Sequence, residues 1–304
     1  MKITELIASA ERPFPSLEVV PPLTGTGSED IFATIADLMP YSPRYINVTC
    51  HRDEYEFRQD ASGAWQRVLV KSRRSPVEIC REITERFGVE TVPHLICAGN
   101  TAEDLQRLLA EVREAGISNI MVLRGDSLSG EKRFTPTEGG YSHASELVEA
   151  ARAFSQELCI GVGGYPEKHF EAANLDDDIR ALKRKTDAGA GFIITQMFFD
   201  NEKFYDFERR CREAGITVPI IPGIKPLSTA RHIAMLPEAF SIDIPLPLTE
   251  AVREVQDDPE AIYRLGTDWA VAQVRDLLAH GVKAVHFYTM GRSRNIKEIL
   301  NACF

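Results

Sequence analysis

The sequence lacks the short motifs that mark several large enzyme classes. It has no G-x-G-x-x-G, no G-x-x-x-x-G-K-[ST] and no G-x-S-x-G run. These absences argue against a Rossmann dinucleotide domain, a P-loop nucleotide site and an acyl-transfer nucleophile elbow. His94 and Cys97 stand three apart on an expected strand and so face opposite sides, and no other spacing suits a metal. We therefore expect no metal site.

Cysteine is scarce and forms no C-x-x-C pair. We expect free, mostly buried thiols in a reducing compartment. No run approaches the roughly 18 apolar residues of a membrane span, and the first 16 residues contain no apolar core of secretory type. The expected location is the cytoplasm. The six cysteines are Cys50, Cys80, Cys97, Cys159, Cys211 and Cys303.

Positive charge is also in short supply, because 35 Lys and Arg face 45 Asp and Glu, for a net charge of −10. Nucleic acids and anionic membranes require a basic face, so neither is an expected partner. A small anionic ligand held by a few local Arg and Lys remains compatible with this balance.

The sequence does contain a repeated unit. Eight short apolar runs recur along the chain, and their near-continuous Val and Ile content is typical of parallel strands buried on both faces. The expected strands are 17–20, 45–49, 91–97, 119–123, 159–165, 192–199, 218–224 and 284–289.

Helical patterns separate these strands. Thr101 is a plausible N-cap, and Leu105, Leu109 and Val112 follow at helical spacing. A glycine closes several helices just before the next strand, as a left-handed C-cap does. These glycines are Gly116, Gly189, Gly215 and Gly281. Eight such units in about 300 residues, without a linker, predict a single-domain α/β fold over residues 1–304, a (βα)8 or TIM barrel.

Two segments interrupt the repeat. Residues 53–74 read as a hairpin around Ala61-Ser62-Gly63, and residues 127–141 form a Gly-rich polar loop. Both follow strands, so both are expected at the carboxyl-terminal face of the barrel, where active sites of this fold are built.

Polar side chains recur in or just after the apolar strands. Each alone is typical of a capped or solvated residue. Together they would line one mouth of one barrel, which indicates a ligand site. They are Glu18, Thr49, His94, Arg124 with Asp126, Tyr165, Gln196, Lys225 and Tyr288.

Three of these patterns have a chemical interpretation beside a structural one. Glu18 sits in an apolar strand, where burial suits a carboxyl to act as a general acid, or else where it pairs with a buried cation. In Arg124-Gly125-Asp126 the glycine allows close approach to a flat ligand, although three residues are a weak signal. Residues 183–185, Lys-Arg-Lys, cannot all share one helix face, so they either solvate the surface or partly grip a pyrophosphate.

Nine short motifs occur in order along the chain, on the strands and helices expected above. They are SLEVVPP at 16–22, INVT at 46–49, PHLIC at 93–97, LRGD at 123–126, YPEKH at 165–169, LKRK with DAGA at 182–190, TQMFFD at 195–200, IPGI at 221–224 and HFYT at 286–289. With these motifs the chain resembles bacterial methylenetetrahydrofolate reductases over nearly its whole length.

The resemblance implies a barrel that holds FAD non-covalently without a Rossmann domain. It implies NADH or NADPH as electron donor, methylenetetrahydrofolate as substrate and a homo-oligomeric assembly. Glu18 would be the general acid, Asp126 the carboxylate beside flavin and pterin, and Gln196 a residue shared by folate and nicotinamide. His232, Tyr288 and Arg292 would contact the substrate. The implied FAD contacts are Thr49, His94, Arg124, Gly125, Asp126, Ala144, Tyr165, His169, Ala172, Asp178, Arg184 and Lys185.

The sequence departs from the family pattern at a few positions. Ala181 replaces a polar Asn near the cofactor, His232 a Gln that contacts folate, and Leu236 a Phe at the substrate site. The hairpin at 53–74 is longer than expected. These departures leave Glu18, Asp126 and Gln196 intact.

The implied chemistry is ping-pong hydride transfer from reduced nicotinamide through FAD to the folate, which feeds methionine synthesis. Glu18 would protonate the folate nitrogen that leaves when its bridged ring opens. Two alternatives stay open: another flavin or aldolase-type barrel enzyme, and a flavin- or folate-binding subunit without catalysis. No Rossmann acidic residue is present to distinguish NADH from NADPH.

Overall fold

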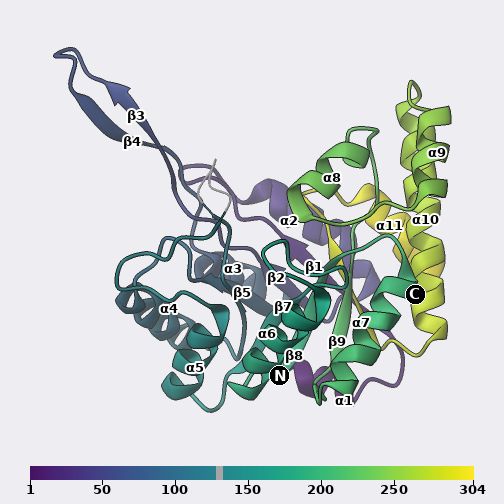
Figure 1. Cartoon of the computed structure of the whole chain (residues 1–304), viewed down its shortest axis with the longest axis horizontal. Helices are drawn as coiled ribbons and strands as arrows, with labels where there is room; N and C mark the ends of the chain where they lie inside the picture. Colours follow the sequence, from purple (N-terminus) through teal and green to yellow (C-terminus); the bar gives the residue numbers. More distant parts are fainter. Residues whose placement is uncertain (128–132) are drawn as a thin grey trace.

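Eight parallel strands close into a barrel ringed by helices (Figure 1). The computed structural model describes residues 1–127 and 133–304. Around the barrel the order is β1-β10-β9-β8-β7-β6-β5-β2. This confirms the predicted (βα)8 fold. The barrel strands are β1 Phe14–Val19, β2 Tyr45–Val48, β5 Glu90–Ile96, β6 Asn119–Leu123, β7 Cys159–Gly164, β8 Phe192–Met197, β9 Ile220–Ile224 and β10 Ala284–Tyr288.

All eight predicted strands exist, and the differences lie at their ends. β1 begins at Phe14 rather than Leu17, because its first residues pair with β10 in the register Phe14 to Ala284. Pro15 and Ser16 do not continue an apolar run, so the pattern missed them. β9 begins at Ile220, two residues later than predicted.

Helices cover the outside of the barrel. Thr101 caps α4 as predicted: its hydroxyl accepts from the Asp104 N–H at 3.1 Å, and the Asp104 carboxylate accepts from the Thr101 N–H at 2.9 Å. The four predicted closing glycines all have positive φ. The helices are α1 Ile3–Ala8, α2 Glu29–Leu38, the 3-10 turn η1 Met39–Tyr41, α3 Pro76–Phe87, α4 Ala102–Glu114, α5 Ala144–Phe154, α6 Leu175–Asp187, α7 Asn201–Glu213, α8 His232–Phe240, α9 Leu246–Glu254, α10 Pro259–Ala279 and α11 Arg294–Cys303.

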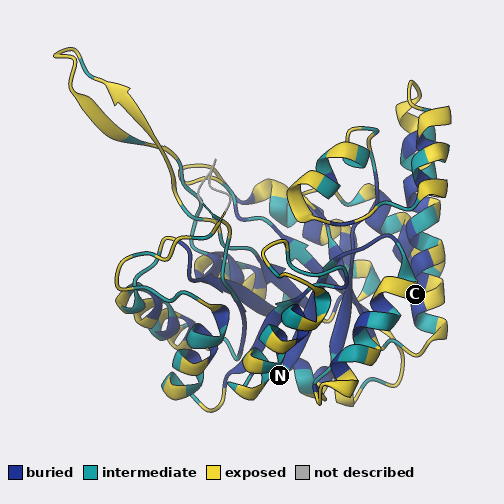
Figure 2. Cartoon of the chain, viewed as in Figure 1, coloured by how far each residue is buried: buried dark blue, intermediate teal, exposed yellow. Residues whose placement is uncertain are grey.

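The hydrophobic core consists of three clusters of buried side chains. Outward-facing strand residues pack against the helices, as Figure 2 shows by the dark strands beneath half-exposed helices. A second cluster, with Tyr45, Met121 and Phe192, fills the lower barrel and includes residues of α1. A third packs Leu236 with Phe199 and residues of α9 and α10. Burial of each large side chain contributes roughly 1.5–3 kcal/mol, so the barrel is a firm scaffold for its rim.

A two-stranded ribbon projects far from the body (Figures 1 and 2). It consists of β3 Glu54–Gln59 and β4 Trp65–Lys71, which pair antiparallel, and it confirms the predicted hairpin. Phe57 and Trp65 are 68% and 66% exposed. Because paired residues share a face, Tyr55, Phe57, Trp65 and Leu69 lie on one side together with Gln59 and Arg67, and we call this side the ribbon's apolar face.

One sequence expectation falls partly outside the described residues. The predicted polar loop at 127–141 leaves β6, and its residues 128–132 lie outside the described ones. Within the described residues, no helix has the length and apolar content to cross a membrane.

A close helix-to-loop contact supplies a stability prediction. Gly266 of α10 lies against Leu227, and an added Cβ would stand 1.9 Å from the Leu227 carbonyl oxygen. Gly266→Ala must push backbone away from backbone, so we expect a loss of about 1–3 kcal/mol in the free energy of unfolding. Urea denaturation measures it. Asp268→Ala, two residues away on the exposed side, should change stability by less than about 0.5 kcal/mol; equal stability of both variants would contradict the packing argument.

Candidate active site

A layer of polar side chains crosses the interior of the barrel at its upper end. Alternation along β1 sends Leu17 and Val19 outward into the core and Ser16 and Glu18 inward. Parallel pairing sets Ser16 beside His286 and Glu18 beside Tyr288 on β10. Glu18 also pairs with Asn47 on β2. The closed register therefore gathers one carboxyl group and several hydrogen-bonding groups in a single layer.

Two imidazoles face the Glu18 carboxylate. Its Oε2 lies 3.7 Å from Nε2 of His94 and 3.7 Å from Nε2 of His286, and the Glu18 side chain is 14% exposed. Burial lowers the pKa of His94 to about 4, against the opposing effect of Glu18. His94 is therefore neutral at physiological pH. Its Nε2 lies 3.0 Å from the Asn47 side-chain amide.

The rim above this layer carries further predicted residues. The Thr49 hydroxyl oxygen lies 3.4 Å from Nδ1 of His51. Burial lowers the pKa of His51, with Arg73 acting in the same direction and Asp126 and Glu18 opposing it. These charges therefore converge on one mouth. Across the barrel, Tyr288 donates to the Thr195 carbonyl at 2.7 Å, and the Gln196 side chain accepts from the Met197 N–H at 2.9 Å.

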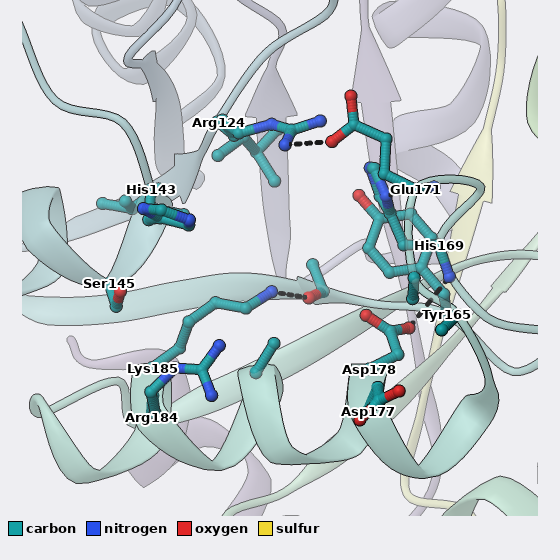
Figure 3. A pocket seen from close by; sticks show the side chains of 17 residues that line it. Arg124, His143, Ser145, Tyr165, His169, Glu171, Asp177, Asp178, Arg184 and Lys185 are labelled. Carbon is teal, nitrogen blue, oxygen red and sulfur yellow. Dashed lines mark hydrogen bonds and ion pairs between the residues drawn. The ribbon is translucent and has the colours of Figure 1, made fainter. Parts of the chain in front are cut away.

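A cavity of about 360 Å³ lies beside this mouth, between the ends of β6 and β7 and the helices α5 and α6 (Figure 3). Eight of the twelve residues predicted to bind FAD line it: Arg124, Ala144, Tyr165, His169, Ala172, Asp178, Arg184 and Lys185. The other four do not line it: His94 lies on β5, Thr49 directly follows β2, and Gly125 and Asp126 come shortly after β6.

Cationic groups line one side of the cavity. Lys185 is half-buried and donates to the Gly163 carbonyl at 2.8 Å, and desolvation lowers its pKa to about 8. Arg184 lies next to it on α6, as Figure 3 shows. His143, Ala144 and Ser145 bring the start of α5 to the same cavity. A helix N-terminus with two cations is a suitable site for a phosphate or pyrophosphate.

The Lys-Arg-Lys run divides as helical geometry requires. Lys183 forms an ion pair with Asp187 outside the cavity, whereas Arg184 and Lys185 line it. The run is therefore divided between the helix surface and the cavity wall, and binding of a pyrophosphate by Arg184 and Lys185 stays a prediction.

The far wall combines charge and aromatic rings. Arg124 forms an ion pair with Glu171 (Figure 3) and stacks 4.7 Å from the centre of the Phe134 ring. Tyr165 packs edge-on against His169 at 4.9 Å, and burial raises the pKa of the Tyr165 hydroxyl. Burial, with Arg124 adding to it, lowers the pKa of His169 to about 4.

Gly125 lets the end of β6 approach the neighbouring strand closely. Its φ is +85°, and a Cβ there would lie 2.7 Å from the Cβ of Ala98. Only glycine fits that conformation and that space. The turn releases Asp126 to an exposed position on the rim.

A second cationic group follows β9 and β10. Lys225 is buried, and burial together with nearby Arg292 lowers its pKa. Burial, then Lys225 and Arg292, lower the pKa of His232 to about 4, and its ring accepts from the Ser228 N–H at 3.2 Å. Lys225 and Arg292 are therefore suited to bind an anionic end of a ligand.

Several residues of the site had no assigned role in the sequence. Glu171, His143 and Ser145 line the cavity beside Ala181, which was noted only as a departure. For Lys225 the sequence indicates only a polar residue just after a strand. His286 belongs to the motif at 286–289, but the sequence assigns it no role. The signal for His286 was its place in an apolar strand, two residues before Tyr288. Leu236 belongs to α8, is fully buried and packs in the third core cluster.

Comparison with known proteins gives a consistent result. The methylenetetrahydrofolate reductase family profile matches residues 2–303. The 5,10-methylenetetrahydrofolate reductases of Escherichia coli and Pectobacterium carotovorum are 32% and 33% identical, with 91% of this chain and 86% of each relative covered.

Longer relatives also match. Methylenetetrahydrofolate reductase (NADH) 1 of Arabidopsis thaliana is 33% identical over 94% of this chain but 47% of its own length. The chain thus spans about half the length of such plant relatives. A solved structure, an uncharacterized protein from Clostridium thermocellum described as binding two copies of 5-methyl-5,6,7,8-tetrahydrofolic acid, shares the fold with a TM-score of 0.62 at 14% identity, over 99% of this chain and 97% of that one. On the profile and the two bacterial relatives, the chain belongs to the methylenetetrahydrofolate reductase family.

Proposed function

We propose that the protein reduces 5,10-methylenetetrahydrofolate to 5-methyltetrahydrofolate, with reduced nicotinamide as donor and non-covalently bound FAD as the intermediate carrier. The observation that carries the proposal is the pairing of a polar catalytic layer around Glu18 with an adjacent cation-lined cavity. Family membership supports the overall reaction. FAD, when bound, supplies a hydride acceptor and donor between the two substrates.

The cavity fits the phosphate-bearing half of FAD. Arg184, Lys185 and the start of α5 would hold the pyrophosphate, and Tyr165, His169 and Ala172 would enclose the nucleoside side. Ala181 lines the same wall, where it offers no hydrogen bond. Arg124, Gly125 and Asp126 would lie along the ring system toward the barrel axis, with Thr49 and His94 on its other side.

Glu18 would act on the folate. Reduction requires the bond between the bridging carbon and N10 to break, so that the carbon, left as an iminium on N5, can accept a hydride. N10 leaves readily only if a proton reaches it, and Glu18 is the partly buried carboxyl group at the mouth that can deliver it. Asp126 would stabilise the developing positive charge electrostatically.

The remaining rim residues would hold the substrate. Gln196 and Tyr288 stand across the barrel from His94, and Gln196 would contact folate and nicotinamide in turn. Arg292 and His232, with Lys225 behind them, would hold the carboxylate end of the folate. The names of two plant relatives specify NADH and that of a Caenorhabditis elegans relative specifies NADPH, so the donor must be determined by comparing both.

The cofactor assignment rests on Arg184 and Lys185, and the neighbouring Lys183 provides a control. Arg184→Ala with Lys185→Ala should lower FAD affinity at least about 100-fold, since charge-assisted contacts contribute roughly 1.5–3 kcal/mol each. Lys183→Ala removes a neighbouring cation that points away from the cavity and should leave affinity unchanged. Fluorescence titration with FAD measures all three proteins. Equal affinity in the double variant and the control would assign the run to the helix surface alone.

The role of Glu18 as the acid can be tested by measuring the two half-reactions separately. Glu18→Gln keeps the size of the side chain but cannot deliver a proton. Bleaching of bound FAD by the nicotinamide should proceed at a comparable rate, while its reoxidation by methylenetetrahydrofolate should slow at least roughly 10²–10⁴-fold. Anaerobic stopped-flow absorbance follows both. Rapid reoxidation by the folate would remove Glu18 as the acid, and reoxidation by a quinone should be unaffected.

We also propose that the protein self-associates through the ribbon's apolar face. A lone two-stranded hairpin is marginally stable in water, and exposed aromatic side chains on it are typical of an interaction surface. The ribbon Glu54–Lys71 carries three acidic and three basic residues, while the whole chain carries −10. Two copies can therefore approach at the ribbon without the net repulsion that the charge of the whole chain would cause. A C2 arrangement would cover one apolar face with the other.

Sedimentation analysis tests this interface. Phe57→Ser with Trp65→Ser should weaken self-association by at least about 30-fold, because central aromatic anchors often contribute about 2 kcal/mol or more. Leu246→Ser, at a comparably exposed apolar residue on α9 (63% exposed), should leave it unchanged. A monomeric wild-type protein, or a double variant that associates as the wild type does, would contradict the proposal.

A further inference from the structure

The ribbon is anchored to the rim of the barrel by the residues that follow β4. There the chain runs antiparallel to the segment after β1: Leu23 and Arg73 form an isolated bridge, and the Arg74 N–H donates to the Pro22 carbonyl at 3.1 Å. Side chains alternate along such an extended segment, so Arg73 and Arg74 point to opposite sides.

The two arginines have different surroundings. Arg74 forms ion pairs with Glu78 and Glu82 of α3. Arg73 instead donates through Nη1 to the carbonyl of Pro21, two residues past the end of β1, at 2.6 Å. The anchor of the ribbon therefore places the Arg73 guanidinium beside the carboxyl-terminal end of a barrel strand.

Arg73 also lies near the charged groups of the mouth. Burial and then Arg73 lower the pKa of the His51 imidazole, while Asp126 and Glu18 oppose this effect. His51 comes three residues after the end of β2, the strand next to β1 in the barrel. Arg73 therefore belongs to the same rim as the two carboxylates to which the proposed function assigns chemistry.

Arg52 occupies the neighbouring part of this rim. It follows β2 and packs against the loop after β5, where an added Cβ on Gly99 would lie 3.4 Å from the Cβ of Arg52. The strands β1, β2 and β5 are neighbours in the barrel. Arg52 and Arg73 therefore stand at the ends of adjoining strands.

Both guanidinium groups are only partly satisfied. Each side chain is half-buried, and within residues 1–127 and 133–304 its buried Nε has no hydrogen-bond partner. The ion pairs of the ribbon and its anchor, among the described residues, use Arg58, Lys71 and Arg74 and leave Arg52 and Arg73 out. A buried N–H without a partner is costly, and the guanidinium fork matches the oxygens of a phosphate. This part of the rim is therefore suited to bind an oxyanion of a ligand.

The proposed reaction brings three anionic ligands to the barrel, and two of them have cations elsewhere. The FAD pyrophosphate would be held by Arg184 and Lys185 between β6 and β7. The folate carboxylates would be held on the β9 and β10 side, where Arg292 lies. The third anionic group is the diphosphate of the reduced nicotinamide, and Arg52 and Arg73 supply cations for it on the remaining side.

We propose that Arg52 and Arg73 bind the diphosphate of the reduced nicotinamide donor, so that the anchor of the long ribbon is part of the donor site. This inference rests on the proposed function. Neither arginine takes part in hydride transfer, and their contribution is to donor affinity. Folate and donor would use the same place for their rings in turn, but opposite sides of the mouth for their anionic ends.

Neutral substitutions test the charges. Arg52→Gln with Arg73→Gln removes both charges but keeps an amide that can donate to the Pro21 carbonyl. In anaerobic stopped-flow measurements with NADH or NADPH, whichever reduces FAD faster, the apparent dissociation constant should rise about 100-fold, about tenfold for each charge-assisted contact. The limiting rate of flavin reduction should stay unchanged. Arg52→Lys with Arg73→Lys should recover most of the affinity. Arg58→Gln, at an exposed ribbon cation paired with Glu56, should have no effect.

A donor without phosphate separates binding from structural damage. Reduced nicotinamide riboside has the same hydride-donating ring, so it should reduce the flavin of the wild type and of the double Gln variant at equal rates. Reoxidation by methylenetetrahydrofolate and titration with FAD should also be unchanged. Unaltered affinity for the dinucleotide donor, an equal loss with the riboside, or weakened binding of folate or FAD would each overturn the inference. A wild-type flavin that neither dinucleotide bleaches would contradict the proposed function, and this inference with it.

Discussion

Closure of the barrel between β1 and β10 is the constraint on which the site depends. This pairing joins residues about 270 positions apart in the chain and fixes which side chains of the two strands share a layer. A shift of one residue would turn Glu18 outward into the helix layer and bring Leu17 inside. The apolar residues on either side of Glu18, packed against the helices, prevent that shift. The position of the proposed acid is therefore a consequence of core packing.

In the cavity, the charged residues of one helix are divided between solvent and the cavity wall. On α6, Lys183 and Asp187 pair in solvent while the half-buried Lys185 donates to the Gly163 carbonyl. The Lys185 ammonium loses hydration, which lowers its pKa to about 8 although the nearby Asp178 carboxylate acts in the opposite direction. An anionic ligand would restore the lost interaction. Opposite, Arg124 is already paired with Glu171, so that wall presents less free positive charge than its sequence suggests.

Much of this could be predicted from the sequence because local patterns carried it. Near-continuous Val and Ile runs identified the strands, and a glycine before four of them identified helix ends. Strand ends then implied a common rim for Glu18, Asp126 and Gln196. Contacts between residues far apart in the chain could not be predicted from such local patterns. The Arg124–Glu171 pair joins residues 47 apart, and His286 meets Ser16 across 270 residues. The early start of β1 at Phe14 likewise depends on its partner strand and not on its own composition.

The same closure has a consequence for how the chain acquires its structure. One edge of β1 finds its partner only when β10 has been made, so during synthesis that edge stays unpaired while the other strands assemble. Loop closure over such a separation makes the last step slow, and an open parallel sheet with an apolar edge is prone to join another chain. Newly made molecules of this protein therefore pass through an incomplete barrel whose risk of aggregation ends only when its first and last strands meet.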